Sequence, residues 1–533
     1  MRQTFRLTFL QDNRTADVTG QQTLMEALKQ AGIFLDAPCG GQGTCGKCLV
    51  RISPDGDSWQ EVKACQTKIT SDLWVDIGKS AGNHRILTTS SIRKVSYAPS
   101  LPENIDLDSL ENYYLAAFDI GTTTIAAYLL DGANGEQLCT ASSLNPQAAY
   151  GADVISRANY NLEHGSRELA DCIHGAIDEL IGELSRKAGI DRERIIQICL
   201  VGNTCMHHIF FQYPMDSLVR APYEPYQRGL IRDQAAKYQI HIHPQGELMF
   251  LPVIAGFVGA DTMGCILTIQ PDQKEEITLM LDIGTNGELV LGNRERLICC
   301  STAAGPAFEG AKIECGMRGA QGAIDHVTWN ERGFHYSVIG GGNPVGICGS
   351  GLIDTIACLL CAGLMESSGR LLTPEEAARE KKTWSEHLAM RDGKPVFLFD
   401  PQEDSVYLTQ KDIREVQLAK GAISAGILLM ERELGISHEQ IQTVYIAGAF
   451  GNYMDPKSAC DIGLLPPELR NRVVPVGNAA GEGAKLALLN RGEMEKTKIL
   501  MSNVDFLELA VIPEFQDCFV DELEFPEQDE EEG

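Results

Sequence analysis

Hydrophobic and polar residues alternate over residues 3–10, which predicts a half-buried β-strand near the start of the chain. A second strand is expected near residues 14–18. Thr23 and Glu26 then have the spacing of a helix capping box, and apolar residues recur at helical intervals until Gly32. The order of two strands and a helix indicates the start of a β-grasp domain.

Four cysteines follow this predicted helix with the spacing C-x5-C-x2-C-x16-C, at Cys39, Cys45, Cys48 and Cys65. Four thiolates can hold a [2Fe-2S] cluster, and the glycines between the first three allow the backbone to curl around it. A zinc site or buried free thiols are the alternatives, but zinc prefers paired C-x2-C sequences and only Cys45 and Cys48 form one. The loop resembles that of [2Fe-2S] ferredoxins, with a shorter gap before Cys65 than in plant-type members. The resemblance implies one-electron transfer.

The rest of the chain repeats one order of elements twice. Residues 115–128 and 278–291 each read as an apolar strand, an Asp-Ile-Gly-Thr turn and a second apolar strand, which predicts two hairpins. In each half a long amphipathic helix, a capping turn and a strand that ends in glycine come later: helices 166–188 and 409–434, strands 195–202 and 441–448. The repetition indicates an internal duplication.

The two predicted turns carry groups that suit a nucleotide. Turn glycines with threonine hydroxyls and free backbone N–H groups can cradle phosphate oxygens, and an aspartate at the strand end can hold Mg²⁺. Two ordinary tight turns are the alternative, but the matched contexts favour a clamp that grips phosphates from both sides. Asp119 and Asp282 are the candidate catalytic residues. The expected phosphate and Mg²⁺ contacts are Asp119, Gly121, Thr122, Thr123, Asp282, Gly284, Thr285, Asn286 and Gly287.

This pair of turns resembles the phosphate-1 and phosphate-2 motifs of the actin, sugar kinase and Hsp70 superfamily, whose halves are ribonuclease H-like. Residues 445–451 resemble its adenosine motif, which implies that Gly448, Ala449 and Gly451 contact the nucleoside of ATP. Several further residues either line the cleft or have an ordinary structural role: Asp261, the glycine turns 340–342 and 349–351, and Lys411, Arg414 and Lys420 on the predicted helix 409–434.

A ferredoxin domain joined to such a body resembles the reductive activators of corrinoid proteins. The similar segments are residues 39–48, 145–157, 201–204, 305–310, 314–319, 347–354 and 476–480. The resemblance implies ATP-dependent return of cob(II)alamin to cob(I)alamin with one electron from the [2Fe-2S] cluster. It also implies two partners, a corrinoid protein of a methyltransferase system and an upstream electron donor. Relatives that activate methylamine methyltransferases carry cysteine-rich [4Fe-4S] segments near the C-terminus, where this chain has only Cys518, so one cluster is expected.

Two other functions fit the same motifs. A small-molecule kinase with a regulatory cluster would form a phosphorylated metabolite without a corrinoid. A non-catalytic redox- and nucleotide-sensing protein would bind nucleotide and a partner without turnover.

The remaining histidines and cysteines that could bind a metal are more easily explained by structural roles. We expect His207 and His208 to form a packed helix start, and the following cysteines to be small buried side chains: Cys299, Cys300, Cys348, Cys358 and Cys361.

Acidic residues outnumber basic ones by 73 to 45 in the 533 residues, for a net charge of −28, which argues against non-specific binding of nucleic acid or anionic membranes. No apolar run of about 18 residues and no apolar segment of a signal peptide occur, so we expect a cytoplasmic protein whose cysteines are thiols or metal ligands. Actin-like ATPases often form dimers, so the resemblance makes a second copy of this chain a candidate partner.

These observations predict an α/β and α+β multidomain protein in which a β-grasp [2Fe-2S] ferredoxin precedes a duplicated actin-like ATPase. The expected parts are a ferredoxin domain at 1–78, a linker at 79–112 that contains Pro99 and Pro102, a first ATPase half at 113–275, a second half at 276–520 and an acidic disordered tail at 521–533.

Overall fold

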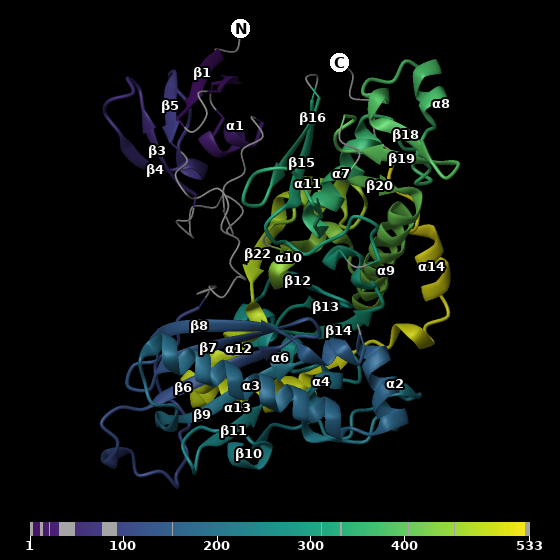
Figure 1. Ribbon diagram of the computed structural model, residues 1–533. Coiled ribbons are helices and arrows are strands. Elements are labelled where there is room, and N and C mark those ends of the chain that lie inside the picture. The colour runs from purple at the N-terminus through teal and green to yellow at the C-terminus, as the bar shows by residue number, and fades with distance from the viewer. Residues whose placement is uncertain are drawn as a thin grey trace.

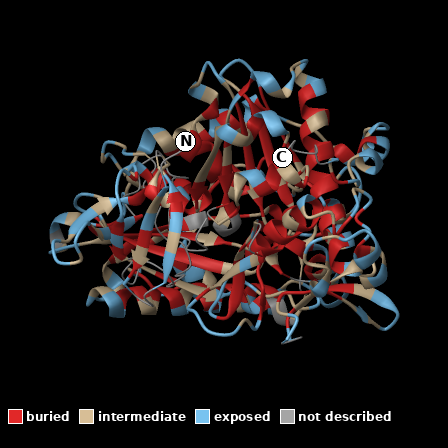
Figure 2. Cartoon of the chain, turned by 90° about the horizontal axis from the view of Figure 1, so that it is seen from above, coloured by how far each residue is buried: buried red, intermediate tan, exposed pale blue. Residues whose placement is uncertain are grey.

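The computed structural model describes residues 4–10, 14–20, 22–30, 48–76, 93–151, 153–310, 312–330, 333–402, 405–451 and 453–527 (Figure 1). A small sheet near the N-terminus is followed by two larger α/β halves. Buried residues, red in Figure 2, make up the interior of both halves, and exposed residues lie mainly on loops and outer helix faces. No described helix is both long enough and apolar enough to cross a membrane.

The N-terminal part is a five-stranded mixed sheet with the strand order β2-β1-β5-β3-β4. Its elements are β1 (Thr4–Phe9), β2 (Thr15–Thr19), α1 (Leu24–Gln30), β3 (Leu49–Ser53), β4 (Gln60–Lys63) and β5 (Leu73–Asp76). The predicted capping box is confirmed, because the Glu26 N–H donates to Thr23 Oγ1 at 3.2 Å and the Thr23 N–H donates to the Glu26 carboxylate at 2.7 Å. The parallel pairing of β1 with β5 is that of a β-grasp sheet. Gly32 lies outside the described residues.

The two halves contain sheets of the same design. The first has the order β10-β11-β9-β6-β7-β8 and the second β22-β21-β12-β13-β14-β23. The strands of the first are β6 (Tyr114–Ile120), β7 (Thr124–Asp131), β8 (Gln137–Leu144), β9 (Ile195–Gly202), β10 (Ile231–Gln234) and β11 (Glu247–Phe250). Those of the second are β12 (Ile277–Ile283), β13 (Gly287–Gly292), β14 (Leu297–Thr302), β21 (Ile441–Ala447), β22 (Val473–Gly477) and β23 (Val504–Phe506).

Hairpins β6–β7 and β12–β13 occupy equivalent places in the two sheets, and β9 and β21 run parallel to the first strand of each. The long helices α3 (Arg167–Ala188) and α9 (Gln410–Leu434) precede β9 and β21, as the sequence predicts. The other helices of the first half are α2 (Val154–His164), α4 (Thr204–Phe211), α5 (Asp216–Val219) and α6 (Ala260–Ile269). The internal duplication is therefore confirmed.

The second half carries two additional small sheets. Their strands are β15 (Ala323–Asn330), β16 (Gly333–Val338), β17 (Gly346–Ile347), β18 (Leu388–Arg391), β19 (Lys394–Leu398) and β20 (Tyr407–Thr409). Its remaining helices are α7 (Gly349–Cys361), α8 (Pro374–Arg379), α10 (Gly448–Gly451), α11 (Pro456–Asp461), α12 (Ala479–Leu489), α13 (Arg491–Asn503) and α14 (Phe515–Asp521).

Helices α6 and α12 cross in direct backbone contact. A Cβ on Gly483 would lie 2.1 Å from the Gly264 carbonyl oxygen, and a Cβ on Gly264 would lie 2.6 Å from that of Ala480. Thr268 Oγ1 donates to the carbonyl oxygens of Gly264 and Ala479, at 2.9 and 2.8 Å. The hydrophobic core of the first half continues through both helices to the second sheet, so this crossing joins the two halves.

Gly483→Ala should lower the free energy of unfolding by about 2 kcal/mol or more, because the new methyl group meets backbone atoms that cannot turn aside. The midpoint of urea unfolding measures the effect. Gly175→Ala is the matched control, since no atom lies within 4 Å of its Cβ position on α3, and it should be neutral or stabilising. Equal midpoints for the two variants would contradict the tight crossing.

Two segments that the sequence marks by composition make specific contacts with the body. The first is the predicted linker 79–112, over its described residues 93–112. Arg93 donates to the Leu267 carbonyl oxygen at 3.1 Å and to the Glu493 carboxylate, and the Ala98 N–H donates to the Leu489 carbonyl oxygen at 2.9 Å. Polar groups of this segment find partners on the body, although the segment itself has little regular structure.

The acidic tail is likewise ordered from Asp521 to Pro526. Phe525 is 3% exposed, Ser424 donates to the Glu522 carboxylate at 2.6 Å, and Lys420 donates to the Glu524 carbonyl oxygen. Phe525 packs beside α9, and Glu522 and Glu524 each accept a hydrogen bond from a side chain of that helix. The acidic composition alone therefore gave the wrong expectation for this part of the tail.

Candidate functional site

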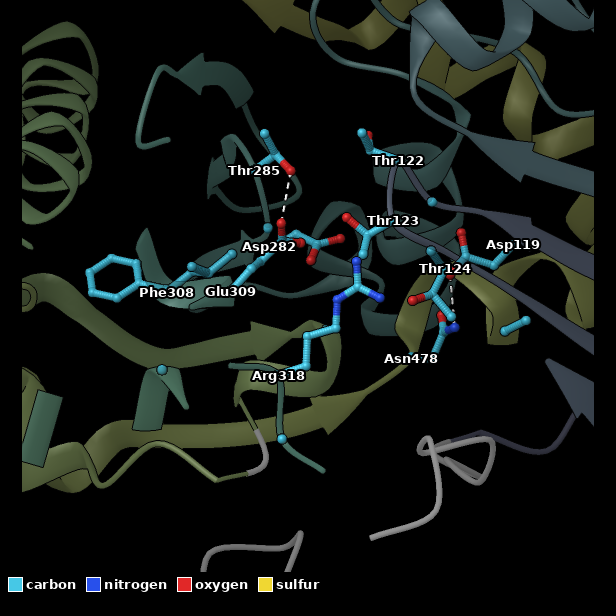
Figure 3. Close-up of a pocket in the computed structure, with 18 of the residues that line it drawn as sticks. Asp119, Thr122, Thr123, Thr124, Asp282, Thr285, Phe308, Glu309, Arg318 and Asn478 are labelled. Atoms are coloured by element: carbon cyan, nitrogen blue, oxygen red, sulfur yellow. Dashed lines mark hydrogen bonds between the residues drawn. The ribbon is translucent and has the colours of Figure 1, made fainter. Parts of the chain in front are cut away.

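A cavity of about 480 Å³ lies between the two halves, and both Asp-Ile-Gly-Thr hairpins open into it (Figure 3). Its wall includes most of the residues that the two hairpins were predicted to contribute: Asp119, Gly121, Thr122, Thr123, Asp282, Gly284, Thr285 and Asn286. Gly287 is not among the lining residues. It lies behind the turn, where a Cβ would be 2.7 Å from Thr302 Oγ1.

The first hairpin places Asp119 at the end of β6. Asn478 Nδ2 donates to Asp119 Oδ2 at 2.8 Å, and the Asn478 side chain also caps α12 by accepting from the Gly481 N–H at 2.7 Å. The turn is tight because the Gly121 N–H donates to the Thr124 carbonyl oxygen, only 2.7 Å from where a Cβ on Gly121 would lie. A residue of the second half thus fixes the aspartate of the first.

The second hairpin is closed by the Gly284 N–H, which donates to the Asn286 carbonyl oxygen at 2.9 Å. Thr285 Oγ1 donates to Glu309 Oε2 at 3.0 Å. Glu288 pairs with Asp282 across the hairpin and also lines the cavity. The turn therefore presents Asp282 together with two further carboxylates.

Five carboxylates line the cavity: Asp119, Asp261, Asp282, Glu288 and Glu309. Burial, together with the Asp282 carboxylate, raises the pKa of both Asp119 and Asp261 to about 7. Burial and the Glu309 carboxylate raise the pKa of Asp282 to about 6. A divalent cation would offset this repulsion, and carboxylate oxygens are the ligands that Mg²⁺ prefers. The donor set fits a Mg²⁺–nucleotide complex.

The predicted nucleoside contacts lie on α10. Gly448 lines the cavity with a φ of +83°, and a Cβ there would be 3.0 Å from Asp282 Oδ1. Gly451 packs against Ile446 instead and is not a lining residue. Ala449 belongs to the same short helix, and its side chain is outside the described part of the structure. Of the two predicted glycines, Gly448 is brought to the cavity wall and Gly451 is not.

The structure shows which of the other candidate residues line the cavity and which do not. Asp261, Gly349 and Ser350 line the cavity, whereas the glycine turn 340–342 does not. Lys411, Arg414 and Lys420 on α9 are also absent from its wall, and Lys420 is buried against the C-terminal segment. His207 and His208 lie in the middle of α4 among aromatic rings, and Cys299 and Cys300 are buried in β14. Cys361 at the end of α7 is exposed, so its expected burial is wrong.

Two of the four predicted cluster cysteines fall within the described residues. Cys48 precedes β3 and Cys65 follows β4, both are buried, and their Sγ atoms are 3.2 Å apart. This distance is far longer than a disulfide bond, so the two thiols converge without being joined. Such a pair fits two ligands of an iron–sulfur cluster. Cys39 and Cys45 lie outside the described residues.

Comparison with known proteins identifies each part of the chain. Residues 8–70 match the 2Fe-2S iron-sulfur cluster binding domain, residues 114–274 the RACo middle region, and residues 276–532 the C-terminal ASKHA domain of RACo. The corrinoid activation enzyme RamQ of Eubacterium limosum is 32% identical over 575 aligned positions, which cover 95% of this chain and 96% of that protein. This chain belongs to the family of reductive activators of corrinoid proteins.

Other members of the reductive activator family extend the comparison. The [Co(II) methylated amine-specific corrinoid protein] reductase of Methanosarcina barkeri is 25% identical, with 77% of each chain covered. The solved structure of a reductive activator for corrinoid, iron-sulfur protein is 31% identical, covers 98% of both chains and superposes with a TM-score of 0.70. The predicted fold, a ferredoxin domain before an actin-like ASKHA body, is confirmed for this reductive activator.

The structure adds cavity residues that the sequence did not single out in this role: Asn203, Glu288, Glu309, Arg318 and Asn478. Asn203 Nδ2 donates to Thr122 Oγ1 at 3.0 Å, as Asn478 does to Asp119. Both asparagines follow a Val-Gly pair at the end of a strand and cap the next helix. This repeated Val-Gly-Asn was a usable signal in the reductive activator sequence, whereas Arg318 was marked only by its place in the family-like segment 314–319.

Proposed function

We propose that this protein reductively activates a corrinoid protein, returning its cobalt from the cob(II) to the cob(I) state with one electron, under the control of ATP. The single electron is what the [2Fe-2S] cluster supplies when it is bound by Cys39, Cys45, Cys48 and Cys65. Membership of the family supports the reaction class. The observation that carries the ATP dependence is the convergence of both Asp-Ile-Gly-Thr hairpins on one cavity that is rich in carboxylates.

We assign Asp119 and Asp282 to Mg²⁺, with Asn478 holding the Asp119 carboxylate in place. The backbone N–H groups and threonine hydroxyls of both turns would contact the phosphates, and Gly448 allows the nucleoside to approach the backbone. Because the lining residues come from both halves, a nucleotide bound there would fix the halves relative to each other.

The free energy needed for an uphill electron transfer is similar to the free energy that nucleotide binding must supply to shift a conformational equilibrium. An electron transfer that is uphill by about 250 mV costs about 6 kcal/mol. Driving a two-state equilibrium from 1:99 to 99:1 takes about 5.5 kcal/mol of differential binding. A nucleotide that binds one arrangement of the halves more tightly can therefore favour a partner complex in which cob(II) is more easily reduced.

The test is cob(II) reduction under anoxic conditions, followed by visible spectra. The corrinoid protein would be recovered by anoxic pull-down with the full chain, and a low-potential chemical reductant would be present throughout. We expect formation of cob(I) with Mg²⁺ and ATP, and at least tenfold less without ATP. Equal yields with and without ATP would remove the proposed nucleotide control, and no reduction in either case would remove the proposed function.

A further inference from the structure

Glu309 connects the two phosphate turns of the cavity. Thr285 Oγ1 of the second hairpin donates to its Oε2 atom at 3.0 Å, and the Thr123 side chain of the first hairpin lies close enough to lower the pKa of the same carboxylate. Glu309 ends the short 3-10 turn Pro306–Glu309, which is fixed by buried Ala307 and Phe308. A carboxyl group is therefore held where threonine side chains from both halves meet.

Arg318 lies beside this carboxylate. Among the described residues that line the cavity it is the only one with a positively charged side chain, against five carboxylates. Figure 3 shows its guanidinium group extending toward Glu309 and Thr123. Burial raises the pKa of Glu309, and the Thr285 hydroxyl and the Arg318 charge oppose that shift. No hydrogen bond or ion pair from the described residues fixes the guanidinium group. Its backbone is held by the neighbouring Met317 N–H, which donates to the Ile347 carbonyl oxygen at 2.8 Å.

Carboxylate and phosphate oxygens accept from the same donors. A threonine hydroxyl that donates to Glu309 can donate equally to a phosphate, and a guanidinium group forms paired bonds with either anion. A terminal phosphate carries more negative charge than a carboxylate, so it gains more from a nearby arginine. A diphosphate that does not extend to this point would leave the Glu309 contacts undisturbed.

We propose that Arg318 and Glu309 form the device by which this protein distinguishes ATP from ADP. The terminal phosphate of ATP displaces Glu309 from Thr123 and Thr285 and takes Arg318 as its counter-charge. This inference rests on the proposed nucleotide site and adds its specificity. It assigns opposite effects to two neighbouring charges, since Arg318 favours ATP and Glu309 competes with its terminal phosphate.

The experiment measures the dissociation constants of ATP and ADP at fixed Mg²⁺ by isothermal titration calorimetry on the full chain. Arg318→Ala should weaken ATP binding at least tenfold and change ADP binding less than twofold, and Arg318→Lys should restore part of the loss. Glu309→Gln should tighten ATP binding severalfold with little change for ADP. Arg296→Ala is the matched control, because Arg296 is half-exposed and pairs with Glu433 and Asp505 away from the cavity.

Unchanged ADP binding in each variant shows that the site is folded. Equal losses of ATP and ADP in Arg318→Ala would overturn the inference, because Arg318 would then act only as a general attractive charge. Weaker ATP binding with a raised Mg²⁺ requirement in Glu309→Gln would also overturn it and make Glu309 a metal-binding residue. If the wild-type protein bound neither nucleotide, the proposed ATP site itself would fail.

Discussion

Replacing Cys65 with alanine should abolish reduction of the corrinoid partner while leaving ATP binding unchanged. The Cys65 and Cys48 Sγ atoms converge in the core of the N-terminal sheet, and loss of one thiolate leaves the iron–sulfur cluster without one of its four expected ligands. The rate of cob(I) formation should fall to that of the reductant alone, a loss of at least about 100-fold. Visible absorption and electron paramagnetic resonance of anaerobically reconstituted protein should show the loss of the cluster.

Cys361→Ala is the control for this result, because Cys361 is an exposed cysteine at the end of α7, distant in sequence from the predicted cluster loop. It should retain both the cluster signal and the reduction rate. Calorimetric ATP binding to Cys65→Ala shows that the body of the protein is folded. A full cluster signal in Cys65→Ala would contradict the ligand assignment.

Asp282→Asn should lower ATP hydrolysis about 100-fold. A metal ion that stabilises charge on a reacting phosphate contributes several kcal/mol, and each 1.36 kcal/mol is a factor of ten in rate. Steady-state phosphate release with the corrinoid partner present measures the effect. Asp505→Asn in the same sheet is the control, since its carboxylate is exposed and pairs with Arg296.

The same variant should be more stable to heat in metal-free buffer. Burial and Glu309 raise the pKa of Asp282 to about 6, so ionisation of this carboxylate opposes folding. The gain in melting temperature should be absent near pH 3, appear as the pH rises above the unfolded-state pKa, and be complete above about pH 6. Lower activity together with lower stability at pH 8 would indicate general damage instead.

The sequence predicted best the features that are local and repeated. Each Asp-Ile-Gly-Thr turn depends on neighbouring residues, and its second copy shows that the pattern is not accidental. Glu309 and Arg318 could not be placed in this way, because they reach the cavity from turns and loops whose path depends on the folded second half. Asn478 lies 359 residues from its partner Asp119. The one sequence signal for its role is the Val-Gly-Asn motif that it shares with Asn203.

Composition was a weaker guide than periodicity. Residues 93–112 and the acids after Asp521 both have the polar character of loose chain, yet each contains a few residues that fit the body. Arg93 finds a carboxylate on α13, and Phe525 fills an apolar site beside α9. A single well-placed contact can hold a polar segment, and counts of charged residues do not record where such contacts occur.

The crossing of α6 and α12 gives the nucleotide site a mechanical connection to the N-terminal domain. Both helices begin at the cavity, with Asp261 on one and Ala480 on the other. About 15 Å away, their far ends hold the segment that leads back to that domain, through Arg93 at Leu267 and Ala98 at Leu489. A rotation of one helix against the other would therefore shift the attachment points of the segment that precedes them. The position of the N-terminal domain would then change with the state of the cavity.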